Sequence, residues 1–392
     1  MAEENKANKA VIIFIAIGIS IIVGILAIIC TNAIIINAQM KNAVNAVTIQ
    51  ENVSLYSSKN MSKVKQDLEL GTNTYILESD ISNNNEPIYK VKVGKKVGYI
   101  HKDDLKYFEE TNMKKELMLD VSQFNMKNNF SSIGEFKAFV LNNNIKYVYI
   151  RAGGRGYGKA GNFYKDTSYK EFADACEYLH IPFGFYFLEE AITSNEVDEE
   201  VKFIEDFINE NNYEYNKLPI ALDIEKHLEE GRADGIWDKR YVLVNELIAK
   251  LEQKKYNVIV YSNASIANQY LTKVNTELWL AYYPSITEEP SYWYSDTDGE
   301  GATNKELISK MVGWQFSQTG IPNKISKNVD VSIGYSNYFK SGSTLDVLND
   351  ISGKSKIISK IFELKDKTPK VFNTYNLGRD RYYGEKLRRD NE

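Results

Sequence analysis

The sequence predicts an α/β protein whose main domain is a TIM-like (β/α) barrel with irregular last strands, preceded by a small all-β barrel and one transmembrane helix. Three observations support this. An uncharged apolar run lies near the N-terminus, short strand-like segments follow it, and beyond residue 115 strand-like runs alternate with helical ones. Alternating strands and helices form parallel sheets, and about 250 residues is typical of an eight-stranded barrel. An open doubly wound sheet is the structural alternative.

Composition narrows the class of protein. A chain of 392 residues exceeds one average domain, and a net charge of −5 argues against a nucleic-acid partner. Cys30 and Cys176 lie in an apolar run and a helical pattern, so we expect no disulfide framework. The histidines His101, His180 and His227 are too widely spaced for a zinc or iron site. We therefore expect no metal and no cofactor.

The first predicted element is a membrane anchor. Residues 1–10 are polar, and an uncharged apolar run follows from residue 11 to beyond residue 30. About 20 apolar residues match the thickness of a bilayer, whereas a cleavable signal has an apolar region of only ~7–15 residues. We therefore expect an uncleaved helix over residues 11–36. Lys6 and Lys9 precede it, which predicts a cytoplasmic tail over residues 1–10 and an extracellular remainder of a single-pass cell-membrane protein.

Short strand-like segments follow between residues 47 and 108, separated by turn residues such as those at 82–87 and 94–96. The order of LYSSKNMSKV, LELGTNTYILES and YKVKVGKKVGYIHKDDL resembles that of a bacterial SH3-like domain. The resemblance implies either a domain that binds cell-wall peptide or a spacer, and both remain open.

The main domain is predicted over residues 116–340. Its strand-like runs are ELMLDVSQF, KYVYIRAGG, FGFYFLEE, LPIALDIE, NVIVYSN, ELWLAYY, MVGWQFS and NVDVSIGY, with a long insertion at residues 284–310. The segment GGRGYG, residues 153–158, lacks the helix start that a dinucleotide site needs, so we expect a flexible loop at the barrel mouth. Residues 341–392 are predicted to be a charged extension, because residues 353–392 hold eleven Lys and Arg against six Asp and Glu.

Two carboxylates one residue apart end the fourth strand-like run. Alternate residues of a strand face opposite sides, so Asp223 and Glu225 share the face of Ala221, opposite three large apolar residues. The same alternation places Asp120 of the first run and Asp330 of the eighth on the inward face. Barrel active sites lie at the C-terminal ends of the strands. The sequence therefore predicts four carboxylates at one mouth.

Four acids at one mouth raise each other's pKa, which points to chemistry or to a cation site. Calcium or magnesium is the alternative occupant of such a site. Glycoside hydrolysis needs one protonated acid and one ionised neighbour. We expect a raised pKa for Glu225 and a charged Asp223 held by hydrogen bonds. Residues at the same strand ends are candidates for contacting sugars: Arg151, Tyr186, Tyr261, Trp279, Tyr283 and Gln315, with Tyr282 and Trp314 as further members.

The order of LMLDVSQF, YIRAGG, IPFGFYF, PIALDIE, VYSN, LWLAYY, GWQFSQTG and ISKNVDVS resembles that of the Chalaropsis-type lysozymes, glycoside hydrolase family 25. The resemblance implies an N-acetylmuramidase that cuts the β-1,4 bond between N-acetylmuramic acid and N-acetylglucosamine of peptidoglycan. By resemblance, Glu225 is the general acid, Asp223 its partner carboxylate, and Asp120 and Asp330 the flanking acids.

Two departures leave the subsites open: Phe187 stands where this family commonly has His, and Ser332 where Asn is frequent. A membrane-tethered muramidase suits local remodelling of the cell wall, with glycan strands as its partner. A chitinase-like or other glycosidase and a non-catalytic wall-binding scaffold are the alternatives.

Overall fold

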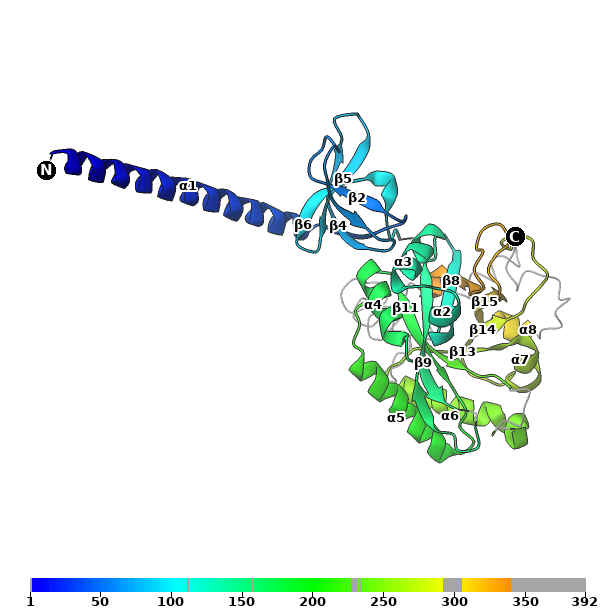
Figure 1. Ribbon diagram of the computed structural model, residues 1–392. Coiled ribbons are helices and arrows are strands. Elements are labelled where there is room, and N and C mark those ends of the chain that lie inside the picture. Colours follow the sequence, from blue (N-terminus) through cyan, green and yellow to red (C-terminus); the bar gives the residue numbers. More distant parts are fainter. Residues whose placement is uncertain are drawn as a thin grey trace, which may run out of the picture. The chain divides into compact units, whose positions relative to one another are not determined.

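The computed structural model describes residues 2–110, 113–156, 158–226, 232, 234–291 and 305–339. The chain divides into two compact units, Met1–Tyr107 and Phe108–Glu392 (Figure 1). The predicted charged extension at 341–392 lies outside the described residues, and so do residues 292–304 of the insertion. The same holds for residues 227–231, which come shortly after the Asp223–Glu225 pair.

The N-terminal unit starts with the long helix α1 (Ala2–Met40). Its stretch Ile17–Met40 has a mean hydropathy of 2.7 and is long and apolar enough to cross a membrane. Within this stretch the hydroxyl of Thr31 is satisfied by the helix itself, because its Oγ1 donates to the carbonyl oxygen of Ala27 at 2.8 Å. Length and composition fit an anchor and a signal sequence alike.

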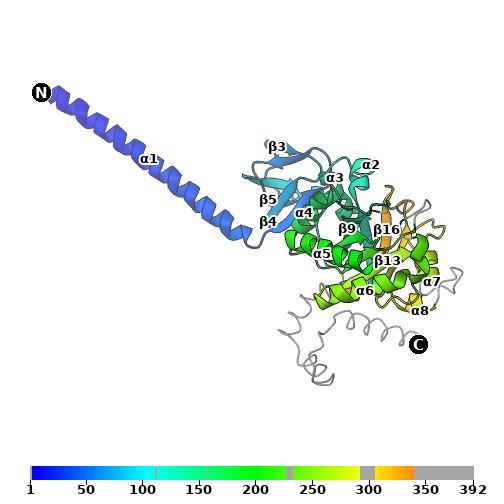
Figure 2. The same cartoon turned by 90° about the horizontal axis from the view of Figure 1, so that it is seen from below.

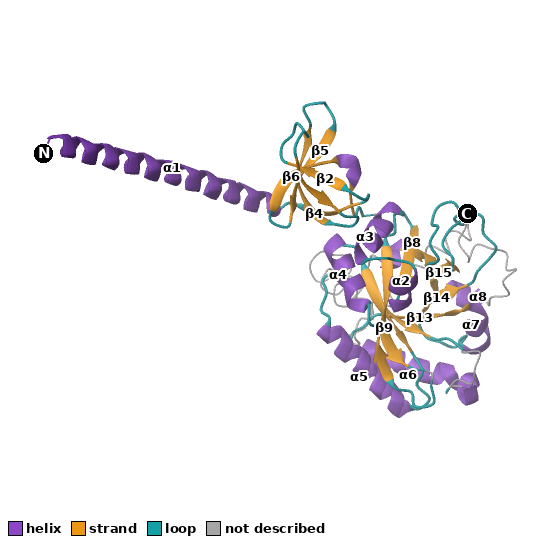
Figure 3. Cartoon of the chain, in the orientation of Figure 1, coloured by secondary structure: helices purple, strands orange, loops and turns teal. Residues whose placement is uncertain are grey.

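The rest of this unit is one antiparallel seven-stranded sheet in the order β3-β2-β6-β5-β4-β1-β7 (Figure 3). Its strands are β1 (Val44–Thr48), β2 (Val53–Tyr56), β3 (Val64–Leu68), β4 (Asn73–Ile81), β5 (Pro87–Val93), β6 (Lys96–His101) and β7 (Leu105–Tyr107). Alternating side chains such as Leu55, Val91 and Ile100 form its buried core. The turn expected at residues 94–96 is present, with Gly94 at a φ of 55°. Strand β3 was not foreseen, since four of its five side chains are exposed.

The second unit is a closed barrel of eight strands, which confirms a mixed α/β barrel. The strands are β8 (Lys115–Val121), β9 (Tyr147–Arg155), β11 (Phe183–Leu188), β12 (Ile220–Asp223), β13 (Val258–Asn263), β14 (Glu277–Ala281), β15 (Met311–Ser317) and β16 (Asp330–Tyr335). They pair in that order, and β8 pairs with β9 to close the ring. Strand β16 is antiparallel to both neighbours. Residues 318–329 contain no helix that could carry the chain back for a parallel return.

Helices cover the outside of the barrel, and α5 and α6 lie side by side there (Figure 2). The helices are α2 (Gln123–Asn128), α3 (Ile133–Asn142), α4 (Tyr169–Leu179), α5 (Ser194–Glu210), α6 (Arg240–Gln253), α7 (Ala264–Tyr270), α8 (Lys305–Ser309) and α9 (Ser336–Phe339). Side-chain oxygens of Ser122, Ser132, Thr193 and Asn263 cap helix N-termini. These caps fix where the chain turns from strand to helix.

The barrel interior is filled by one face of each strand. Met118, Tyr149, Ala221 and Trp279 belong to a single buried cluster inside the ring. This is the face that the alternation in LMLDVS and IALDIE assigned to the interior. Larger apolar residues of the opposite face are buried beneath the helices.

The segment GGRGYG is different from the prediction. Gly153, Gly154 and Arg155 continue strand β9, and the short strand β10 (Phe163–Lys165) pairs with them. Both glycines have a φ near +140°, at 139° and 146°, a conformation open mainly to glycine. A Cβ would lie 2.0 Å from the Tyr164 carbonyl oxygen at Gly153, and 2.3 Å from that of Leu188 at Gly154. The first three residues of the expected loop therefore belong to a strand, and close neighbours restrict its two glycine positions to glycine.

Candidate active site

A cavity of about 370 Å³ opens at the end of the barrel where parallel strands finish. Its lining residues are Asp120, Ser122, Phe124, Asn125, Arg151, Tyr164, Tyr186, Leu188, Asp223, Glu225, Tyr261, Trp279, Tyr283, Gln315, Gln318 and Asp330. Ten of the twelve candidates for catalysis or substrate contact thus lie around one hollow. Tyr282 and Trp314 do not line this cavity. Trp314 is buried, and its Nε1 donates to the carbonyl oxygen of Tyr282 at 2.9 Å.

The four carboxylates reach this mouth from three strands. Asp120 lies near the end of β8, Asp223 ends β12, and Glu225 follows two residues later. Asp330 begins β16 rather than ending it. Because β16 runs antiparallel, its first residue lies at the same end as the last residues of the others, and Asp330 pairs directly with Asp120. The irregular strand direction therefore completes the cluster.

Burial controls the protonation of these acids. It raises the pKa of Asp120 well above its ordinary value, and the neighbouring Asp330 raises it further. Burial also raises the pKa of Asp330 to about 6, with Glu225 as the second cause. Acids that share one small cavity cannot all ionise at neutral pH without a large electrostatic cost.

Asp223 differs from the expectation of a charged group held by hydrogen bonds. Its side chain is 9% exposed, and its Oδ1 has no hydrogen-bond partner among the described residues. Burial, followed by repulsion from Glu225, raises its pKa well above the ordinary value, while Arg151 lowers it. The physical reason is position: Asp223 ends a strand inside the barrel, whereas Glu225 lies beyond the strand end and is exposed.

Gln315 links one acid to two tyrosines. Its Nε2 donates to Asp120 Oδ2 at 2.8 Å. Its Oε1 accepts from the hydroxyls of Tyr261 at 2.7 Å and Tyr283 at 2.6 Å. In this arrangement the amide presents its donor end to Asp120 and its acceptor end to the two phenols.

Arg151 is held in the cavity wall by residues that the sequence did not mark. Its Nε donates to Asp166 Oδ2 at 2.8 Å, and its guanidinium lies over the ring of Phe124 at 4.8 Å from the centroid. Asp166 in turn accepts from the backbone of Gln123 and Ser168. Phe124 directly follows the strand motif DVSQ, a position that could have marked it. Asp166 follows β10, a strand absent from the sequence prediction.

Trp279 is part of the cavity wall, and its ring is too buried to be an open surface for stacking on a sugar. It is 2% exposed, stacks on Tyr149 at 4.9 Å and meets Tyr261 edge-on at 4.7 Å. Its Nε1 donates to Ser332 Oγ at 3.0 Å, which gives the unusual serine a structural partner. Phe187, the other departure, packs outward against Phe203 and outside the cavity.

Within the part of the chain that the structure describes, no three His, Cys, Asp or Glu side chains are arranged to hold a metal ion. The mouth thus presents carboxylates, phenols, an amide and one guanidinium. This set can donate and accept protons and can bond to the hydroxyl and amide groups of a sugar.

Comparison with known proteins gives a family match over the barrel. Residues 119–325 match the family "Glycosyl hydrolases family 25". No curated protein matches the chain.

Solved structures that are similar to this chain include three bacterial proteins. The spore cortex lytic enzyme SleM of Clostridium perfringens is 20% identical over 58% of this chain and 69% of its own, with a TM-score of 0.43. The modular autolysin LytC of Streptococcus pneumoniae is 21% identical over 67% of this chain and 59% of its own, with a TM-score of 0.41. A bacterial lysozyme from Streptomyces coelicolor is 19% identical over 55% and 90%, with a TM-score of 0.36.

Proposed function

Since the chain belongs to glycosyl hydrolases family 25, we propose that it is a membrane-anchored N-acetylmuramidase that remodels the cell wall locally. At the coarser level the chain is a glycoside hydrolase of the muramidase type that acts on peptidoglycan. The observation that carries the proposal is the gathering of Asp120, Asp223, Glu225 and Asp330 around one cavity. Paired carboxyls in different environments are what glycoside hydrolysis requires.

In this proposal Glu225 is the general acid. Its exposed side chain at the rim of the cavity suits contact with the glycosidic oxygen, which receives the proton as the C–O bond breaks. Asp223, deeper in the barrel, stabilises the positive charge that develops on the sugar, and Arg151 supports its ionised form. Resemblance to the family implies that the acetamido group of the substrate acts as the nucleophile, oriented by Asp223 or Asp330.

The remaining candidates supply binding. Arg151, Tyr186 and Tyr283 border the hollow where the sugars bind, and Gln315 holds Asp120 while facing the same space. Trp279 supports Tyr261 from behind. A few polar side chains placed in this way fix the orientation of a bound ligand through hydrogen bonds.

The N-terminal unit supports the cellular part of the proposal. The apolar stretch Ile17–Met40 serves as an uncleaved anchor, with Lys6 and Lys9 on its cytoplasmic side. The seven-stranded sheet acts as an SH3-like domain that binds wall peptide or separates the barrel from the bilayer. Anchoring restricts cutting to wall close to the membrane. Protease added to wall-stripped cells should remove the barrel and spare the first ten residues.

Release of reducing ends from purified peptidoglycan tests the catalytic role. Glu225→Gln keeps the size of the side chain but cannot donate a proton as an acid, so the rate should fall by at least ~10². The exposed Glu171, changed to Gln as a matched control, should retain the wild-type rate. N-acetylmuramic acid should appear at the new reducing end. A Glu225→Gln rate above about a tenth of wild type would remove Glu225 as the acid, and N-acetylglucosamine at that end would contradict a muramidase.

A further inference from the structure

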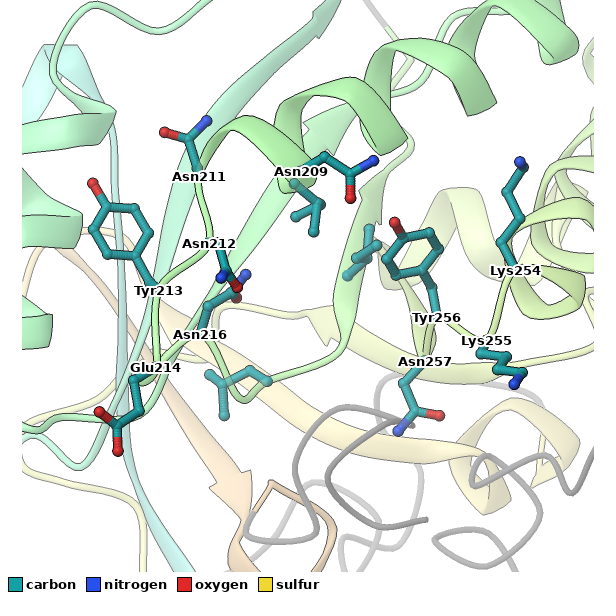
Figure 4. A pocket seen from close by; sticks show the side chains of 13 residues that line it. Asn209, Asn211, Asn212, Tyr213, Glu214, Asn216, Lys254, Lys255, Tyr256 and Asn257 are labelled. Atoms are coloured by element: carbon teal, nitrogen blue, oxygen red, sulfur yellow. The ribbon is translucent and has the colours of Figure 1, made fainter. Parts of the chain in front are cut away.

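A second and larger cavity lies at the opposite end of strand β12. It has a volume of about 680 Å³ and is bordered by the segments that follow α5 and α6 and lead into β12 and β13 (Figure 4). Asp223 ends β12 at the active-site mouth, whereas Ile220 begins it at this cavity. The two sites are therefore joined by one four-residue strand, a span of roughly 10–13 Å.

The lining of this second cavity combines an apolar base with side-chain amides. Leu218 and Ile220 are buried, and Leu218 also belongs to the cluster that fills the barrel. The amide side chains around them are those of Asn209, Asn211, Asn212, Asn216 and Asn257. An apolar cavity with a few convergent polar groups is the usual form of a small-ligand site, and 680 Å³ is within the ~300–1,000 Å³ range of such sites.

Several lining residues are fixed by bonds that leave the hollow open. Asn211 Nδ2 donates to the carbonyl oxygen of Phe207 at 2.8 Å and so closes the end of α5. The Tyr213 hydroxyl donates to Asp174 Oδ1 at 2.8 Å. These contacts hold the wall of the cavity in place.

Three amides are available to a ligand. Among the described residues, the side chains of Asn209, Asn212 and Asn216 form no hydrogen bond with another residue, and each amide offers both donors and an acceptor. Figure 4 shows Asn212 and Asn216 on one side of the hollow and the ring of Tyr256 on the other. Tyr256 is half-buried, which leaves part of a rigid, amphipathic ring for contact.

Charge decides between a neutral and an anionic ligand. The lining includes two lysines and one glutamate, Lys254, Lys255 and Glu214. Lys254 is already paired, because its Nζ lies 2.9 Å from Glu205 Oε2. The remaining positive and negative side chains balance, so the cavity lacks the surplus cations that a phosphate-bearing polymer would require.

We propose that this cavity is a second glycan site, which binds N-acetylated hexosamine residues of the wall glycan through their neutral hydroxyl and acetamido groups. Amides bond to the sugar hydroxyl and acetamido groups, and Tyr256 covers an apolar sugar face. Two attachment points on one insoluble polymer raise the overall binding by multivalency, without any new contact at the active site. This inference rests on the proposed action on peptidoglycan, but not on the acid–base roles of particular residues.

Binding of the full chain to insoluble peptidoglycan tests the second site. The Glu225→Gln background keeps the wall intact, and acid extraction of the wall removes attached anionic polymers. Asn216→Ala with Tyr256→Ala should raise the dissociation constant about fivefold or more, the loss expected from one or two hydrogen bonds and a ring contact. Asn212 is exposed, so Asn212→Ala should not disturb folding. This change should raise the dissociation constant about twofold or more.

The matched control is Asn195→Ala, an exposed asparagine at the other end of α5, which should leave the dissociation constant unchanged. In the active chain, cleavage of a short soluble glycan should be unaffected by Asn212→Ala, because such a substrate cannot reach both cavities. Unchanged binding in both pocket variants would overturn the proposal. So would binding that disappears once anionic polymers are removed, or an equal loss on the soluble glycan.

Discussion

Two groups of acidic side chains lie near the same end of the barrel, and they differ in whether arginines pair with them. At the mouth, Asp120 and Asp223 have no arginine bonded to either carboxylate among the described contacts. Beside it lies what we term the arginine cluster: Arg155, Arg232 and Arg240 with Glu189, Glu196, Glu199 and Glu200. The paired acids join loops, whereas Asp120 and Asp223 have no such cation among the described contacts. Burial raises the pKa of Glu189 and Glu200, as it does that of Asp120 and Asp223, so the two groups differ in their partners.

The arginine cluster connects segments that are distant in sequence. Arg240 Nη2 donates to Glu189 Oε2 at 2.5 Å and to the backbone oxygen of Glu189 at 2.7 Å. Arg155 Nε lies 3.1 Å from Glu200 Oε1, and Arg232 Nη2 lies 2.6 Å from Glu196 Oε1. The ends of β9 and β11, the start of α5 and the segment before α6 are thereby joined.

Removing the charge of a mouth acid should affect the rate most. Asp223→Asn should lower the release of reducing ends by at least ~10², because the developing positive charge loses its partner. The same change should leave the unfolding free energy unchanged or higher, since Asp223 Oδ1 has no bond to lose. Asp238→Asn, at an exposed acid outside the cavity, is the control. A fall in stability would place Asp223 with the structural acids instead.

Breaking the arginine cluster should affect stability rather than chemistry. Arg240→Met leaves Glu189 buried at 1% exposure without its cation, so the unfolding free energy should fall by about 3–5 kcal/mol. Adding Glu189→Gln should recover part of that loss, because no charge then stays buried. Urea unfolding of the barrel measures both variants. An Arg240→Met protein as stable as wild type would show that the cluster does not hold the loops.

A smaller effect is expected at Asp330, and it depends on pH. Its folded pKa of about 6 exceeds the ordinary 3.8, so between these values the folded state binds more protons than the unfolded state. The unfolding free energy then falls as pH rises. Asp330→Asn removes this penalty and should stabilise the barrel at pH 7 by roughly 1–3 kcal/mol. At pH 3 the difference should vanish; a gain that persists there would contradict an ionisation effect.

Much of the barrel and of its mouth could be predicted from sequence. Two-residue alternation in LMLDVS and IALDIE assigns inward faces, because the side-chain period of a strand is fixed. The direction of β16 could not be predicted in this way, since alternation is the same for parallel and antiparallel strands. The continuation of β9 to Arg155 and its pairing with β10 were not predicted, because glycines that accommodate close neighbours have the same letters as glycines in a loop. Arg151 was recognised, but its partner Asp166 lies beyond an unforeseen strand.

The antiparallel direction of β16 also determines how the barrel can be combined with other proteins. Tyr335, at the end of β16, pairs with Lys115, at the start of β8, and the backbone of Ser336 donates to the carbonyl oxygen of Lys114 at 2.6 Å. The start of β8 and the end of β16 are therefore neighbours, away from the mouth that gathers the four carboxylates. Neighbouring ends of this kind allow the barrel to be inserted into a surface loop of a host protein without covering the mouth. They also allow circular permutation, in which these two points are joined and new ends are opened elsewhere.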